Sequence, residues 1–114
     1  MEESATWRGF VVGRDVTVRD NLEAVVEGEA SVFVQLDAGS LQADVAFTDI
    51  LNSHTQRGYA DMEWSDLAVT QGGFADRDAA DDRITGHFFG QEQQEVAGIF
   101  ERAGVSGAFG GRRR

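Results

Sequence analysis

The sequence contains no cysteine and no proline. Without cysteine, neither a disulfide nor a thiolate metal site can form, so the chain suits an oxidising or a reducing compartment equally. No apolar run approaches the ~20 residues that a membrane-spanning helix needs, so we expect a chain that does not span a membrane. The first residues, Met1, Glu2 and Glu3, are acidic and no apolar segment follows them, so we expect no targeting signal in this chain.

Basic residues are also scarce. The chain has 10 basic and 20 acidic side chains, which gives a formal net charge of −10. A chain this acidic repels the phosphate backbone of nucleic acids, so we expect no nucleic-acid partner. The charge is interpreted first as a source of solubility, with a basic partner as the alternative.

The two histidines, His54 and His87, do not have the spacing of a metal site. The acidic run at residues 76–82 resembles a calcium loop only in part. Ala80 stands where the third ligand of an EF-hand would be, and Asp81 replaces its glycine. We therefore expect a solvated loop at residues 76–82 and no metal ion.

Catalytic patterns are missing as well. No serine lies in a Gly-x-Ser-x-Gly context, and no phosphate-binding glycine loop precedes a helix. Glu92 and Glu95 could face each other only across a single helical turn, which is a poor scaffold for acid–base catalysis. We expect a protein that is not an enzyme and that carries no cofactor.

The composition favours one β-rich domain spanning residues 1–114. The chain is 41% apolar, and its 14 glycines are spread along the whole length, as in proteins with many short strands and tight turns. Apolar residues alternate with polar ones on both sides of the turn at residues 37–40, which predicts a hairpin of residues 30–36 and 41–47. Further strands are expected at residues 6–12, 16–18, 60–69, 84–89, 96–102 and 105–109.

These strands predict an all-β protein: a single eight-stranded antiparallel up-and-down β-barrel. A short helical turn is expected near residues 91–95, where the sequence Gln-Glu-Gln-Gln-Glu contains good helix formers. Loops are expected at residues 20–27, 50–58 and 71–83. The barrel core is predicted to contain Trp7, Val32, Val34, Leu36, Val45, Phe47, Trp64, Phe88, Phe100 and Phe109.

The last third of the chain resembles the closing segments of a bacterial protein family. Residues 84–90 (Ile-Thr-Gly-His-Phe-Phe-Gly), residues 94–102 and residues 105–111 (Val-Ser-Gly-Ala-Phe-Gly-Gly) are similar to the last strands of the transferrin-binding protein-like solute-binding family. This is the C-terminal β-barrel domain of surface lipoproteins of the transferrin-binding protein B type. Residues 7–13, 28–50 and 62–69 are more loosely similar. Phe89, Ala97 and Gly111 depart from the commonest family residues, and the handle domain and long loops of full-length members are absent.

The resemblance implies an eight-stranded barrel at the cell surface of a Gram-negative bacterium, as an outer-membrane lipoprotein, or in the periplasm or outside the cell. It also implies a link to iron acquisition, with an iron or haem carrier as a candidate partner and the export machinery as another. We expect a monomer.

Three functions remain open. The first is a ligand- or protein-binding module that uses loops at one end of the barrel, because loops on a rigid scaffold commonly carry recognition. The second is a structural module recognised during export, and the third is a carrier with a small solute inside the barrel. The candidate binding residues are Asn52, His54, Gln56, Arg57, Tyr59, Asp76 and Asp78. The closing residues 112–114, three arginines, are interpreted as a natural end or a cleavage scar, with a contact as the alternative.

Overall fold

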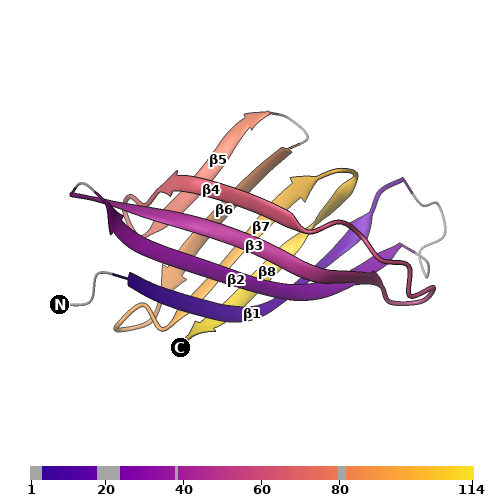
Figure 1. Ribbon diagram of the computed structural model, residues 1–114, viewed down its shortest axis with the longest axis horizontal. Coiled ribbons are helices and arrows are strands. Elements are labelled where there is room, and N and C mark those ends of the chain that lie inside the picture. The colour runs from indigo at the N-terminus through magenta and orange to yellow at the C-terminus, as the bar shows by residue number, and fades with distance from the viewer. Residues whose placement is uncertain (1–3, 18–23, 38, 80–81) are drawn as a thin grey trace.

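The fold is a nearly closed antiparallel barrel, seen in a computed structural model that describes residues 4–17, 24–37, 39–79 and 82–114. Eight strands follow one another in up-and-down order, and Figure 1 shows them curling into one layer around a common interior. Their bounds are β1 Ser4–Asp15, β2 Val25–Asp37, β3 Ser40–Asn52, β4 Met62–Ala68, β5 Gly73–Ala79, β6 Asp82–Phe89, β7 Glu95–Arg102 and β8 Val105–Arg113. The predicted all-β architecture is confirmed.

The strand order places the opening of the barrel in the middle of the chain. Neighbours run β4-β3-β2-β1-β8-β7-β6-β5, so the first and last strands pair with each other. β4 and β5 form the two edges and are bridged only beside their turn, between Thr70 and Gly73. From that turn the two strands diverge (Figure 1). We call this wedge between β4 and β5 the seam.

Aromatic side chains fill the interior. The ring of Phe47 lies 4.8 Å from that of Phe100, 5.3 Å from Phe109 and 5.4 Å from Trp64, measured between centroids. A space beside Phe100, also lined by Val11 and Met62, is too small to admit a water molecule. Of the residues assigned to the core from the sequence, those buried are Trp7, Val32, Val34, Val45, Phe47, Trp64, Phe100 and Phe109. Phe88 is half-buried against them, and the side chain of Leu36 lies outside the described part of the structure.

The helical turn predicted at residues 91–95 is wrong. The β6–β7 hairpin pairs Phe89 with Glu95, so only residues 90–94 remain for the connection. Gly90 and Gln93 both have positive φ, 93° and 54°, which a right-handed helix does not allow. The amide of Gln93 donates to the Gly90 carbonyl at 3.3 Å, which makes a tight turn instead. Across residues 4–17, 24–37, 39–79 and 82–114, no helix is long and apolar enough to cross a membrane.

Two strand assignments also change. The break between the strands predicted at residues 6–12 and 16–18 is wrong, because β1 continues through residues 13–15 and pairs Arg14 with Val25 and Asp15 with Val105. Residues 16 and 17 form a turn, and residue 18 lies outside the described residues. The loop predicted at residues 71–83 contains β5, which pairs Asp76 with Ile84 of β6. Phe74 is the one large apolar side chain that β5 buries, so no apolar alternation marked this strand.

Candidate functional site

The connection between β3 and β4 carries most of the residues predicted to bind a ligand. Asn52 is buried, and its Oδ1 accepts hydrogen bonds from the amides of His54 and Thr55, both at 2.9 Å. The Tyr59 hydroxyl donates to Oδ2 of Asp15 at 2.7 Å, and the Arg57 guanidinium lies 5.6 Å from the Tyr59 ring centroid. These contacts fasten the connection to the barrel end.

Asp15 is a buried carboxylate at the end of β1, and sequence reasoning missed it. Its Oδ1 accepts hydrogen bonds from the Thr17 amide at 2.9 Å and the Thr17 hydroxyl at 2.5 Å. Burial alone would raise the pKa of Asp15, but the bonds from Thr17 and Tyr59 and the charge of Arg57 outweigh it and leave that pKa below the ordinary carboxyl value. Burial and the neighbouring Asp15 raise the pKa of the Tyr59 hydroxyl. Asp15 therefore stays charged, with its partners inside the protein.

The side chains of the other predicted binding residues are not gathered into one site. His54, Gln56 and Arg57 are exposed on the connection, and Asp76 is half-buried on β5. The side chain of Asp78 lies outside the described residues. In the part of the chain that the structure describes, no group of three or more acidic or histidine side chains could hold a metal ion.

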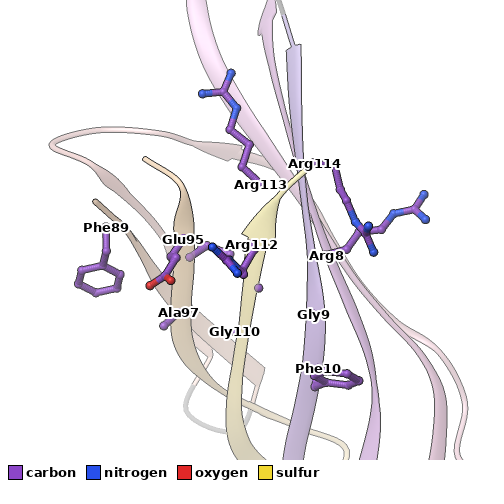
Figure 2. A pocket seen from close by; sticks show the side chains of 12 residues that line it. Arg8, Gly9, Phe10, Phe89, Glu95, Ala97, Gly110, Arg112, Arg113 and Arg114 are labelled. Atoms are coloured by element: carbon purple, nitrogen blue, oxygen red, sulfur yellow. The ribbon is translucent and has the colours of Figure 1, made fainter. Parts of the chain in front are cut away.

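A cleft on the outer wall, near the opposite barrel end, has a different character. It has a volume of about 660 Å³ and crosses β6, β7, β8 and β1. Figure 2 shows Arg112 lying between Glu95 and Arg8. These side chains lie in one row, because Glu95 pairs with Arg112 across β7–β8 and Arg112 with Arg8 across β8–β1. We call this site the arginine cleft; its lining includes Arg8, Phe10, Phe89, Glu95, Ala97, Gly110, Arg112 and Arg114.

Two arginines of the cleft, Arg8 and Arg112, form no ion pair with an acidic side chain in the described part of the chain, although Glu95 lies opposite Arg112 on β7. The two ion pairs seen among residues 4–17, 24–37, 39–79 and 82–114, Arg83–Glu101 at 3.1 Å and Arg102–Asp82 at 2.8 Å, lie elsewhere. Arg8 and Arg112 are exposed and directly opposite each other. Like charges in such cross-strand positions are destabilising. The cleft thus concentrates positive potential on a protein whose net charge is −10.

Arg113, between Arg112 and Arg114, has a different role. Its guanidinium lies 5.7 Å from the Trp7 ring centroid, and its Nη1 donates to the Glu92 carbonyl at 3.2 Å. Trp7 in turn donates from Nε1 to the Gln93 carbonyl at 2.7 Å. Arg113 therefore fastens the β6–β7 turn over the barrel mouth.

The cleft also exposes apolar surface. Phe10 is 74% exposed and Phe89 is 50% exposed, on β1 and β6 respectively. In the row of Phe10 the outward positions on β8 and β7 are small: Phe10 pairs with Gly110, and Gly110 pairs with Ala97. The row of Phe89 continues instead through Glu95 and Arg112. Exposed aromatic rings, an excess of arginines over acidic residues, and small residues at Ala97 and Gly110 suit a ligand that is part apolar and part anionic.

Sequence reasoning missed the arginine cleft, because a contact was the less favoured interpretation of the closing arginines. A partial signal was present: Arg8 and Phe10 alternate with the buried Trp7 and Val11, which puts a cation and an aromatic ring on the solvent face of one strand. No protein-family model matches this sequence, and no curated protein resembles it closely enough to be a match. The comparisons thus assign no family, and what is established is the eight-stranded, nearly closed antiparallel barrel.

Proposed function

We propose that this barrel is a non-enzymatic binding module that recognises an anion-bearing ligand through the arginine cleft. One observation carries the proposal. Arg8 and Arg112 face each other across β1 and β8, and neither forms an ion pair with an acidic side chain among the described residues, Glu95 opposite Arg112 included. This arrangement costs stability in the free protein, and an anion bound between the two guanidinium groups would remove that cost.

The filled interior weighs against the alternative of a solute carried inside the barrel. Phe47, Phe100 and Phe109 occupy the space that such a solute would need. The hydrogen bonds of Asn52 and Asp15 similarly favour a structural role for the β3–β4 connection over a role in recognition. The cell-surface location and the link to iron or haem acquisition belong to the same proposal and rest on the family resemblance alone.

The test is a titration of ¹⁵N-labelled protein with inorganic pyrophosphate at low ionic strength. We expect amide shifts concentrated at Arg8, Gly111 and Arg112. Arg112→Gln should weaken binding by about tenfold, the value of roughly one charge-assisted hydrogen bond. Arg77→Gln is the matched control, because Arg77 is an exposed arginine on β5 outside the cleft and its replacement changes the net charge equally.

Either of two results would overturn the proposal. One is an equal loss of pyrophosphate binding in Arg112→Gln and Arg77→Gln, which would mean that only net charge matters. The other is the absence of saturable shifts at the cleft. Binding that weakens as salt rises and that depends on Arg112 but not on Arg77 supports it.

A further inference from the structure

We infer that the arginine cleft contains a preformed subsite for the apolar part of its ligand, centred over Gly110. The ligand would then be a small amphiphilic anion: a ring or a short acyl chain that carries a carboxylate or a phosphate. This inference rests on the proposed function, because the arginines hold the anionic group. The inference adds to that function the chemical class of the ligand, and it assigns the selection of the apolar part to Gly110.

The sheet geometry sets the size of the subsite. Gly110 on β8 lies between Ala97 on β7 and Phe10 on β1, so the space above it spans two strand spacings, about 10 Å. Along β8, the next outward residue toward the barrel mouth is Arg112, about 7 Å away at two residues of rise. A ring or a chain of six to eight carbons, with its charge at one end, matches both dimensions.

The apolar sides of this space come from neighbouring strands. Phe10 bounds it on β1, and Figure 2 shows Phe89 on the opposite side of the cleft. Phe89 stands on β6 opposite Glu95, in the row next to that of Ala97 and Gly110. Both rings are at least half exposed, so a bound apolar group would remove apolar area from water. Removal of such area from water stabilises binding by about 25 cal/mol per Å² before the costs of association are subtracted.

The backbone does not require glycine at position 110. An added Cβ there would meet only the Val96 carbonyl oxygen, at an ordinary 3.4 Å, and Gly110 is not among the residues with positive φ. Two other glycines of the β1–β8 pair, Gly9 and Gly107, leave no room for a Cβ. A Cβ would lie 1.9 Å from a carbonyl oxygen at Gly9 and 2.2 Å from one at Gly107. Glycine within a strand weakens it, so the missing side chain at position 110 is best explained by the space that it leaves open.

Octanoate, an acyl chain with a carboxylate, is the probe that tests the subsite. Octanol has the chain without the charge, and pyrophosphate has negative charge without the chain. We expect octanoate to shift the amides of Phe10, Ala97 and Gly110, and octanol to bind at least about tenfold more weakly. Gly110→Leu should weaken octanoate binding at least tenfold, weaken pyrophosphate binding by a smaller factor than Arg112→Gln does, and leave the melting temperature unchanged or higher. Ala108→Leu is the matched control, because Ala108 is an exposed residue on the same strand and lies outside the cleft.

The outcomes separate the two proposals. If Gly110→Leu and Ala108→Leu bind octanoate equally well, the apolar subsite is wrong, while Arg112-dependent pyrophosphate binding would still stand. If pyrophosphate binding does not depend on Arg112, the proposed function fails and the subsite fails with it.

A sedimentation assay with phosphatidylglycerol vesicles identifies the source of the amphiphile. Sedimentation that is lost in both Arg112→Gln and Gly110→Leu supports a lipid as the source. Octanoate binding without sedimentation supports a free small molecule. Sedimentation that is unaffected by Gly110→Leu contradicts a role for the subsite in lipid binding.

Discussion

The guanidinium of Arg102 lies 3.9 Å from the centroid of the Trp64 ring, and the two side chains come from opposite sides of the seam. Arg102 is on β7 and Trp64 on β4. Nη1 of Arg102 donates to the Glu63 carbonyl at 2.5 Å, and its Nε donates to Asp82 at 2.8 Å. One side chain thus joins the β4 edge to the β6 and β7 strands where β4 and β5 have diverged and share no backbone hydrogen bonds.

We predict that Arg102→Ala destabilises the barrel by about 2 kcal/mol, because it removes a cation–π contact and two charge-assisted hydrogen bonds that are partly exposed to solvent. Chemical denaturation followed by tryptophan fluorescence measures the change. Amide exchange should rise most in β4, at the edge that Arg102 holds.

Arg102→Lys is the informative companion variant. Lysine keeps the charge but cannot contact Trp64, Glu63 and Asp82 at once, because it lacks the planar fork of arginine. We expect it to recover less than half of the loss. Full recovery by lysine would contradict the role of Arg102 as a bridge across the seam.

A second prediction concerns acid stability. The pKa of Asp15 is lowered in the folded protein, so its charged form stabilises the fold at pH values above the ordinary carboxyl pKa of about 3.9. That stabilisation is lost as the pH falls through the lower, folded pKa. Asp15→Asn should therefore be less stable than the parent at pH 7, and the gap should narrow below about pH 4.

Denaturation curves of the parent and Asp15→Asn between pH 2 and pH 8 measure this gap. The pKa of Tyr59 is raised, so its contribution is complete below about pH 10 and is lost as the pH rises above that value. Tyr59→Phe is accordingly the companion variant, with a stability gap that narrows on the alkaline side. A gap for Asp15→Asn that is constant across the acid range would contradict the assignment.

A third prediction compares Gly9 on β1 with Gly110 on the neighbouring strand β8. A Cβ at Gly9 would lie 1.9 Å from the Gly110 carbonyl oxygen, so Gly9→Ala must push the strands apart and should cost about 2 kcal/mol or more. Gly110→Ala meets no such obstacle and should be neutral or stabilising by up to about 1 kcal/mol. Melting temperatures of the two variants measure the contrast, and equal losses would contradict the steric argument.

The sequence predicted the barrel because most strands bury alternate residues. Val32 and Val34 on β2 and Val45 and Phe47 on β3 all point inward, and this alternation is visible without a structure. The alternation fails where a strand buries little, as in β5. The sequence pattern was also misinterpreted at Gly13. This glycine suggested an interruption between two strands, but it lies within β1, where an added Cβ would meet Val105 at 3.0 Å.

The arginine cleft could not be predicted for a different reason. Arg8 and Arg112 lie near opposite ends of the chain, and only the register of β1 with β8 makes them neighbours. A shift of one residue in that register would place a side chain other than Arg112 opposite Arg8. Local patterns specify which face a residue occupies, but they do not specify which residue lies across from it.

The position of the seam determines where a circular permutation of the chain would leave the strand pairing intact. Every neighbouring strand pair is consecutive in sequence except β1 and β8, whose pairing joins the two ends of the chain, for example Trp7 with Arg113. A circular permutant with a short linker between those ends, cut in the turn at residues 70–72, would place all eight strands in simple succession. Its contacts would all be local, so it should reach the same barrel faster than the parent chain, whose closure must wait for the last strand.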